Sequence, residues 1–345
     1  MSELSNITFS EVCDRLEAAS SVVILTHMRP DADTLGSSFA LRELLRSLGK
    51  RAEVINADEL PKRLRFIFGV DSLRPELFPA DIVPDLVVSV DVSASKLLGD
   101  IEEEWSPRVE LAIDHHVLGT PFAKNTYVGD VGACGEIILD IYREFKARGY
   151  DLLNRAAATA LYAAICSDTG SFKFESVTDE THMRIAELHR VGINHAEIAR
   201  RLYDSRPISQ IMATKAALNA LHFYCGGKLA VINFTQAMMA EDDLTREDID
   251  DIISLTRGIE GVEVGMSIKQ NDEDLTLFKV SMRSNRVADV SKLCAIFGGG
   301  GHVRAGGCTV NAADEKEAEK MLVAEIEREL CALIESGAFE GADEL

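Results

Sequence analysis

The chain has 345 residues, of which 46% are hydrophobic and 27% charged, a composition typical of a soluble globular protein with room for two domains. Its formal net charge of −21 argues against a broad basic surface for long nucleic acid, because nonspecific duplex binding depends on neutralising phosphates. Neither a basic, apolar leader nor an apolar stretch of about 18 residues occurs, so we expect a cytoplasmic protein that does not bind membranes. The seven cysteines include no Cys-x-x-Cys pair, which predicts reduced, buried thiols.

The first half of the chain alternates short apolar runs with helical patterns. The strand-like runs are residues 22–25, 52–55, 86–90 and 111–113, and the helical patterns include residues 34–48 and 135–146. This alternation is typical of βαβ units and predicts a parallel sheet. We expect this first α/β domain over residues 1–190.

A helical linker is expected over residues 191–208, followed by a second domain over residues 209–340. The second domain begins with a helical pattern at 209–222 and then alternates strand-like runs at 229–234, 262–269 and 275–282 with helical patterns at 246–256 and 287–297. This pattern predicts a smaller α/β domain with a mixed sheet, and we expect a cleft between the two domains. The final pattern, 315–336, has acids on one face and apolar residues on the other, as in a packed amphipathic helix.

Acidic and imidazole side chains follow four apolar elements of the first domain, at the point where each element ends. In chain order they are His27, Asp31 and Asp33 after residues 22–25, Asp91 after 86–90, Asp114, His115 and His116 after 111–113, and Asp168 after 156–165. A single such residue is more often a turn, a helix cap or a structural histidine. The carboxyl ends of parallel strands, however, lie along one sheet edge, where ligands bind. The conjunction therefore predicts a metal site there.

The number of these groups favours two ions over one. Six side chains are too many for one catalytic ion that keeps an open position, but they suit two ions sharing a carboxylate. The six candidate ligands are His27, Asp31, Asp33, Asp91, His115 and Asp168. Two ions about 3.5–4 Å apart clamp the attacking and leaving oxygens of a phosphoryl displacement. Carboxylate and imidazole donors favour Mn²⁺, our expectation, or Mg²⁺, with Zn²⁺, Co²⁺ and Fe²⁺ as alternatives.

These motifs resemble the DHH phosphoesterase superfamily, in the same order. The resemblance rests on His27-x-x-x-Asp31-x-Asp33, Asp91, the triplet Asp114-His115-His116, and Asp168. It continues in the second domain, where two segments resemble the DHH-associated domain: Met282-Arg283-Ser284 and Gly298-Gly299-Gly300-Gly301-His302-Val303-Arg304-Ala305-Gly306-Gly307. The pairing is most similar to the bacterial NrnA group of bifunctional oligoribonucleases and 3′-phosphoadenosine 5′-phosphate phosphatases. It departs from the family at Gly306, where alanine is more frequent.

The resemblance implies a role for each group in the first domain. The implied ligands are His27 and Asp31 for one ion, Asp33, His115 and Asp168 for the other, and Asp91 between them. His116 is left to face the scissile phosphate and to serve as a proton donor, while Asp114 fixes a histidine ring. The implied catalytic set is therefore His116, Asp91 and Asp114.

The second domain is expected to bind the substrate. The candidate residues are Arg283, Ser284, Gly299, Gly300, Gly301, His302 and Arg304. Consecutive glycines allow positive φ and bring backbone N–H groups close to an anion, although a flexible turn after the preceding helix explains them equally well. The basic side chains would make a local positive site in an acidic protein.

The resemblance implies hydrolysis of short oligoribonucleotides, including pApA-type dinucleotides, to mononucleotides, and of 3′-phosphoadenosine 5′-phosphate to AMP. The alternatives are a cyclic-dinucleotide phosphodiesterase, a RecJ-type exonuclease, a pyrophosphatase-like enzyme and a non-enzymatic nucleotide sensor. The chain is too short for the extra domains of a RecJ-type enzyme, and a pyrophosphatase would lack the glycine-rich element. A sensor would be free to lose some of the six ligands. We expect short single-stranded RNA or a nucleoside bisphosphate as partner, no long duplex nucleic acid, and a homodimer.

Overall fold

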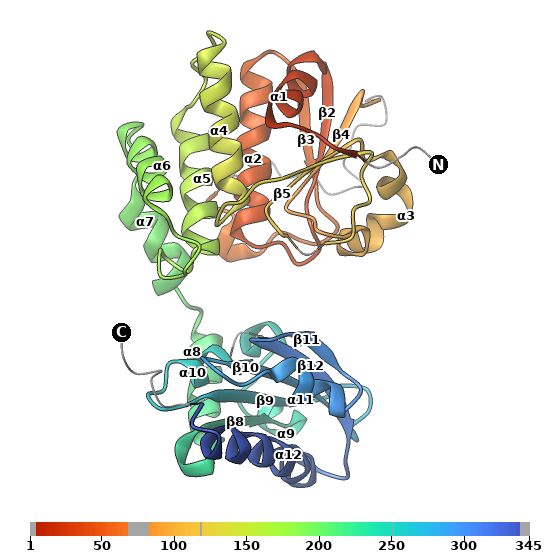
Figure 1. Ribbon diagram of the computed structural model, residues 1–345, viewed down its shortest axis with the longest axis vertical. Coiled ribbons are helices and arrows are strands. Elements are labelled where there is room, and N and C mark those ends of the chain that lie inside the picture. The colour runs from red at the N-terminus through yellow and green to blue at the C-terminus, as the bar shows by residue number, and fades with distance from the viewer. Residues whose placement is uncertain (1–4, 68–82, 118, 251, 339–345) are drawn as a thin grey trace. The chain divides into compact units, whose positions relative to one another are not determined.

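The computed structural model describes residues 5–67, 83–117, 119–250 and 252–338 (Figure 1). The chain divides into two compact units, Met1–Ser205 and Arg206–Leu345. Each unit has its own sheet and its own hydrophobic core. The predicted α/β class, with a parallel sheet followed by a mixed sheet, is confirmed.

The first unit is built on a six-stranded sheet in which every neighbouring pair is parallel. The strand order is β1 (Ser5–Asn6), β6 (Asn125–Val128), β5 (Leu111–Asp114), β4 (Leu86–Val90), β2 (Ser21–Leu25) and β3 (Arg51–Ile55). The apolar runs predicted β2 to β5. Strands β1 and β6 were not predicted, because they are short and mostly polar.

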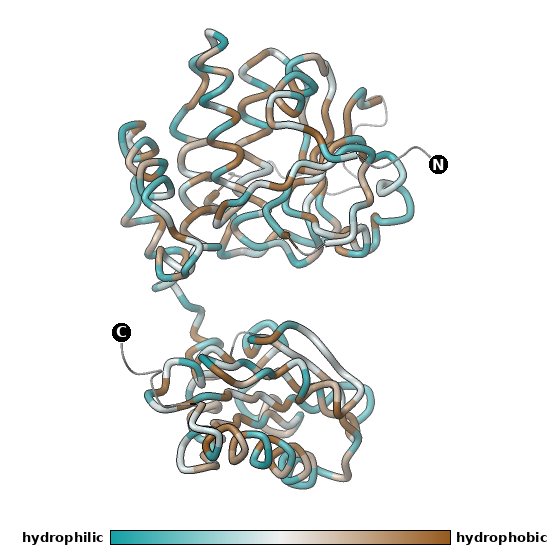
Figure 2. The backbone as a smooth tube through the Cα atoms, in the orientation of Figure 1, coloured by the Kyte–Doolittle hydropathy of each residue, from teal (hydrophilic) through white to brown (hydrophobic). Residues whose placement is uncertain are grey.

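Both faces of this sheet are covered, because alternate residues of each strand point to opposite sides. Val22 and Ile24 of β2 belong to the larger core, which contains the inner faces of α1 (Phe9–Ala18), α2 (Ala32–Ser47), α4 (Cys134–Ala147) and α5 (Arg155–Asp168). Val23 and Leu25 belong to a second core, which also contains Trp105 of α3 (Glu102–Trp105). Helix α3 lies between the turns η3 (Ser95–Ile101) and η4 (Ser106–Arg108). Figure 2 shows the hydrophobic strands between these helices.

Two glycines set how closely α2, α4 and α5 approach one another. A Cβ atom at Gly36 of α2 would lie 2.4 Å from the carbonyl oxygen of Ala160 in α5. A Cβ atom at Gly135 of α4 would lie 2.8 Å from the Cβ atom of Ala164. Only glycine permits these contacts, which bring the N-terminal ends of α2 and α4 against the C-terminal part of α5. The packed helix ends lie beside the predicted metal ligands.

Helices α6 (Asp179–Arg190) and α7 (His195–Ala199) and the turn η5 (Arg200–Asp204) complete the first unit. Ile198 and Leu202 pack against its larger core, and the hydroxyl of Tyr203 donates to the carbonyl of Cys166 at 2.7 Å. Part of the segment that the sequence assigned to a linker thus packs with the first unit. The predicted boundaries at 190 and 208 stay predictions.

The second unit has a mixed six-stranded sheet in which β8 and β9 are the one parallel pair in the described ladder. The strand order is β11 (Gly300–His302), β12 (Ala305–Asn311), β10 (Leu277–Ser284), β9 (Val264–Gln270), β8 (Leu229–Phe234) and β7 (Leu221–Tyr224). One core joins this sheet to α11 (Val290–Ile296) and α12 (Glu315–Glu335). Another core joins it to α8 (Ile208–Asn219) and α9 (Gln236–Glu241).

Two helical predictions in this unit need correction. The predicted helix over 246–256 is wrong, because the described residues of this range form a short turn, η7 (Glu247–Ile249), and the start of a single helical turn, α10 (Ser254–Arg257). The predicted helix over 209–222 stops at Asn219, because the aromatic run that follows pairs with β8 as β7. Among the described residues, no helix is long and apolar enough to cross a membrane. The cleft predicted between the domains stays a prediction.

Candidate metal centre

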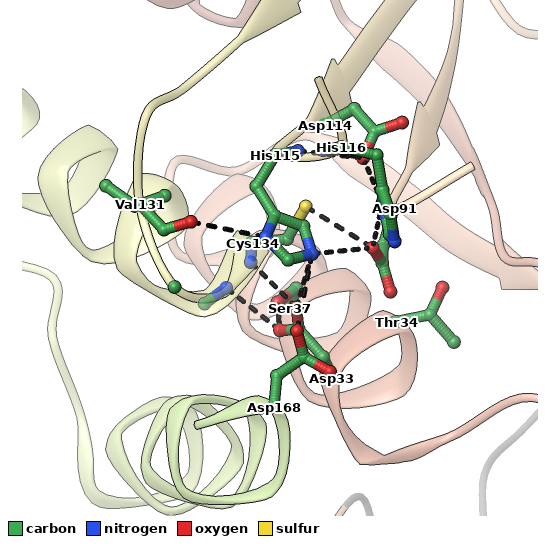
Figure 3. Close-up of polar contacts among 12 residues, drawn as sticks. Asp33, Thr34, Ser37, Asp91, Asp114, His115, His116, Val131, Cys134 and Asp168 are labelled. Carbon is green, nitrogen blue, oxygen red and sulfur yellow. Dashed lines mark hydrogen bonds and ion pairs between the residues drawn. The ribbon is translucent and has the colours of Figure 1, made fainter. Parts of the chain in front are cut away.

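The predicted acidic and imidazole side chains of the first unit come together at one edge of its sheet. Figure 3 shows six of them: Asp33, Asp91, Asp114, His115, His116 and Asp168. Strands β2, β4 and β5 deliver His27, Asp91 and His115 from their carboxyl ends, as parallel pairing requires. Asp33 comes from the first turn of α2, and Asp168 from the last residue of α5.

His115 lies at the middle of this cluster. Its Nε2 atom is 3.4 Å from Asp168 Oδ2, 3.5 Å from Asp91 Oδ1 and 3.9 Å from Asp33 Oδ2. This nitrogen is buried and has no hydrogen-bond partner among the described residues. The Nδ1 atom faces the carbonyl of Val131 at 3.3 Å, an arrangement that orients the ring with Nε2 toward the carboxylates. An orphaned imidazole nitrogen facing three carboxylates fits a divalent metal ion.

Asp91 joins this group to a second one. His27 Nε2 lies 3.7 Å from Asp91 Oδ2 and 3.7 Å from Asp31 Oδ1, whereas the other oxygen of Asp91 faces His115. Asp91 is 4% exposed and has a left-handed backbone with φ 62°, which aspartate tolerates better than most residues. The carboxylate therefore lies between two histidines, where one ion on each side would share it.

Asp31 and Asp33 are also bound to the protein backbone. Asp31 Oδ1 caps α2 by accepting from the N–H groups of Asp33 and Thr34 at 2.9 and 3.1 Å. Asp33 is fully buried and accepts from Ser37 Oγ at 2.9 Å. Its two oxygens also accept from two N–H groups at the start of α4, Cys134 at 2.7 Å and Gly135 at 3.0 Å. The helix-capping role of Asp31 is thus compatible with its predicted role as a metal ligand.

The crowded carboxylates shift the pKa values of two histidines and two aspartates in the cluster. Burial alone would lower the pKa of His27 and of His115, but the neighbouring aspartates raise both pKa values to about 9. Burial raises the pKa of Asp168 to about 6, and burial together with Asp91 raises the pKa of Asp33 well above its ordinary value. Without a cation, protons offset the negative charge. A divalent cation would displace them.

His116 and Asp114 form a hydrogen-bonded pair at the rim of the cluster, where His116 Nδ1 also lies 3.4 Å from Asp91 Oδ1. Asp114 Oδ1 lies 2.8 Å from His116 Nδ1, and it also accepts from the backbone N–H groups of His115 and His116 at 2.7 and 3.1 Å. This hydrogen bond raises the pKa of His116, whose side chain is 49% exposed. Asp114 thus orients the ring of His116, which is open to a ligand.

Two nearby side chains were missed by the sequence analysis. Cys134, the first residue of α4, places its Sγ atom 3.8 Å from Asp91 Oδ1, and Ser37 supports Asp33. The sequence carried one signal for Cys134: it stands directly before Gly135 at the start of a predicted helix. Its approach to the site depends, however, on the packing of Gly135 against α5, which no local pattern reveals.

The candidate substrate-binding residues lie together at one end of the second unit's sheet. Arg283 and Ser284 end β10, Gly300, Gly301 and His302 form β11, and Arg304 lies in the hairpin before β12. Ser284 N–H donates to the carbonyl of Arg304 at 3.1 Å, and Arg283 is the register partner of Ala305. His302 and Arg304 are exposed.

The glycines here permit close backbone contacts within the hairpin. A Cβ atom at Gly299 would lie 2.2 Å from the carbonyl oxygen of Gly307, and one at Gly301, where φ is 140°, would lie 2.4 Å from that of Ala305. A Cβ atom at Gly306 would lie 2.8 Å from Cys294 Sγ, which explains why this chain departs from the alanine of the family. Hairpin packing thus accounts for these glycines without a ligand.

Comparisons with known proteins agree with this architecture. The DHH family, N-terminal domain, matches residues 21–165, and the DHHA1 domain matches residues 226–330. The chain is 30% identical over 315 residues to the bifunctional oligoribonuclease and PAP phosphatase NrnA of Thermus thermophilus, with 90% of each chain covered. It is 23% identical over 314 residues to the NrnA of Bacillus subtilis, with 89% of this chain and 95% of the relative covered.

A solved structure shares the fold. An exopolyphosphatase-related protein from Bacteroides fragilis superimposes with a TM-score of 0.83 at 23% identity, over 93% of this chain and 97% of that one. The matched domains, the similarity over nearly the whole chain and the convergent cluster lead to one conclusion. The chain belongs to the DHH family of phosphoesterases, hydrolases that act on phosphoester bonds, with a DHH domain followed by a DHHA1 domain.

Proposed function

We propose that this protein is a two-metal phosphoesterase that hydrolyses short oligoribonucleotides, including pApA-type dinucleotides, to mononucleotides and 3′-phosphoadenosine 5′-phosphate to AMP. The observation that carries the proposal is Asp91, whose two oxygens face two separate histidines in the cluster. The names of the Thermus and Bacillus relatives support the substrate class, because the similarity extends over about 90% of this chain.

The distances support the ligand assignment that the family resemblance implies. His27 and Asp31 would hold one ion, Asp33, His115 and Asp168 the other, and Asp91 both. Mn²⁺ is the proposed metal, with Mg²⁺ and Co²⁺ as alternatives, because most donors are carboxylate oxygens and imidazole nitrogens. When bound, the ions would activate a water molecule and neutralise charge on the phosphoryl oxygens.

His116 is the proposed proton donor to the leaving ribose oxygen. Its ring is held by Asp114 at 2.8 Å and is half exposed, so it can contact a bound phosphate. The raised pKa keeps this imidazole protonated at higher pH than a free histidine, as a general acid requires. Asp114 therefore acts on the reaction by positioning His116.

The second unit is proposed to bind the substrate through its cluster at the β10 end and the β11–β12 hairpin. Arg283, His302 and Arg304 would contact phosphate, and Ser284 and the backbone of Gly299, Gly300 and Gly301 would complete the site. Short substrates suit such a confined positive site better than long strands do, given the net charge of −21. We further propose a cytoplasmic homodimer.

The test is a Mn²⁺-dependent hydrolysis panel with a dinucleotide, a short and a long RNA, 3′-phosphoadenosine 5′-phosphate, cyclic di-AMP and pyrophosphate. The proposal predicts cleavage of the short RNAs and release of phosphate from the bisphosphate. Asp91→Ala and His115→Ala should abolish both activities, whereas Asp151→Ala, at an exposed position, should not. Activity confined to pyrophosphate, cyclic di-AMP or long RNA would contradict the proposed substrates, and inactivity with every metal would favour a sensor.

A further inference from the structure

Cys134 lies inside the metal centre, although sulfur is not needed for the proposed two-ion site. The thiol is fully buried, 3.8 Å from Asp91 Oδ1 and 3.8 Å from the carbonyl of Ile113. Its ligand atom and those of Asp33, Asp91 and His115 all lie within 4.8 Å of one another. The backbone N–H of Cys134 also donates to Asp33, which fixes the start of α4 against the cluster.

The spacing of these four donors matches a tetrahedral ion. Zn–O and Zn–N distances near 2.1 Å and a Zn–S distance near 2.3 Å place neighbouring tetrahedral donors about 3.4–3.6 Å apart. The corresponding distances are 3.5 Å between His115 and Asp91, 3.8 Å between Cys134 and Asp91, and 3.9 Å between His115 and Asp33. The other three pairs lie within 4.8 Å, so shifts of up to about an ångström would bring all four donors to one ion. The orphaned Nε2 of His115 points into this same space.

We propose that Cys134 gives the centre a second mode of metal binding, in which a thiophilic divalent ion, Zn²⁺ or Cd²⁺, is held by Asp33, Asp91, His115 and Cys134. The sulfur–metal bond forms as the thiol proton passes to solvent, so no oxidant or reductant takes part. This inference rests on the proposed metal centre and adds the selectivity of that centre for soft ions.

The second mode has a functional consequence. Four protein ligands complete a tetrahedral shell, and a closed site lacks the open position that catalysis requires. Zn²⁺ and Cd²⁺ should therefore inhibit the Mn²⁺-loaded enzyme by displacing an ion, and the inhibition should depend on Cys134. Mn²⁺, which prefers oxygen and nitrogen donors, should bind with nearly the same affinity whether or not the sulfur is present.

Spectroscopy tests the sulfur ligand directly. The Co²⁺-loaded protein should show an intense near-ultraviolet band from sulfur-to-cobalt charge transfer, and X-ray absorption of the Zn²⁺-loaded protein should show one sulfur at about 2.3 Å. Cys134→Ser, whose hydroxyl can still donate to Asp91, should lose both signals and weaken Zn²⁺ binding at least about tenfold. Cys166→Ser is the matched control, because that buried thiol faces Tyr203 and Ser171 and should leave both signals intact.

The outcomes separate this inference from the proposed function. Suppose that the wild-type protein hydrolyses the substrate panel with Mn²⁺ but shows no sulfur signal with Co²⁺ or Zn²⁺. This result would overturn the inference and leave the proposed function standing, and it needs no variant. Signals that persist in both Cys134→Ser and Cys134→Ala would overturn it as well. A wild-type protein with the sulfur signal but without hydrolysis would support the second mode and contradict the proposed function.

Discussion

Metal binding at the centre should release protons, in a number that depends on pH. The pKa values of about 9 mean that His27 and His115 are both protonated at pH 7 in the metal-free protein. A metal ion needs the neutral ring, and deprotonating one such ring at pH 7 costs about 3 kcal/mol, because each pH unit corresponds to about 1.4 kcal/mol. With one histidine for each ion, the affinity for each Mn²⁺ should rise about tenfold per pH unit from pH 7 to 9 and then level off.

The folding stability of the metal-free protein should change in the opposite direction. A raised pKa means that the folded state binds the proton more tightly than the unfolded chain does. This contribution is fully present below the ordinary histidine value of 6.5 and is lost as the pH rises through about 9. Metal-free protein should therefore unfold more easily at pH 9 than at pH 6.5, and Mn²⁺ should restore its stability most strongly at the higher pH.

Calorimetric titration with Mn²⁺ measures this linkage. Titrations in two buffers of different ionisation enthalpy should report at least two protons released per chain at pH 7, because His27, His115 and the buried Asp33 all bind protons more tightly in the metal-free protein, and fewer at pH 9. His182→Gln, at an exposed position on α6, should leave the proton count unchanged. Mn²⁺ binding without proton release at pH 7, or an affinity that stays flat from pH 7 to 9, would show that the metal does not displace protons from His27 and His115.

Substitutions at three sites test the supporting structure. Asp91→Asn and Asp91→Ala should both abolish hydrolysis. In denaturant titrations, the free energy of unfolding of the alanine variant should be about 1 kcal/mol lower than that of the asparagine variant, because alanine tolerates the left-handed backbone less well. Gly135→Ala should cost about 1–3 kcal/mol and reduce activity, since it forces α4 from α5. Gly258→Ala, whose Cβ atom would make only an ordinary contact at 3.8 Å with the Leu255 carbonyl oxygen, should do neither. Arg184→Met should cost about 3–5 kcal/mol, because the buried Glu136 carboxylate loses its ion pair and keeps only the neutral donors Gly132 N–H and Thr181 Oγ1. Adding Glu136→Gln should recover part of that loss, and thermal unfolding without these differences would contradict the packing argument.

The fold was predictable where one local pattern decided the structure. Strands β2 and β4 are buried on both faces, so their apolar runs were unambiguous. Strand β6 lies between β1 and β5 but has the sequence Asn-Thr-Tyr-Val, and β12 begins with Ala-Gly-Gly, so neither looked like a strand. Their pairing depends on neighbours that are distant in the sequence, such as β10 for β12.

The residues of the candidate site were likewise predictable only where a local sequence pattern placed them. Asp31 and Asp33 are close in sequence to His27, and Asp114 adjoins both histidines of its triplet, so strand ends sufficed to bring these groups together. Cys134 enters the centre only because Gly135 lets α4 pack against α5, a tertiary contact without a periodic signal. The glycines before His302 were ambiguous for the opposite reason, because hairpin packing and anion binding favour the same residue.

Asp91 is proposed to be shared between two ions. Electron paramagnetic resonance of the protein loaded with Mn²⁺ tests it most directly, because two ions bridged by one carboxylate are magnetically coupled. The wild-type protein should bind two Mn²⁺ ions per chain with a coupled spectrum, and His27→Ala should leave a single, uncoupled ion. A wild-type protein that binds one uncoupled ion, at saturating Mn²⁺ and pH 8, would contradict the account.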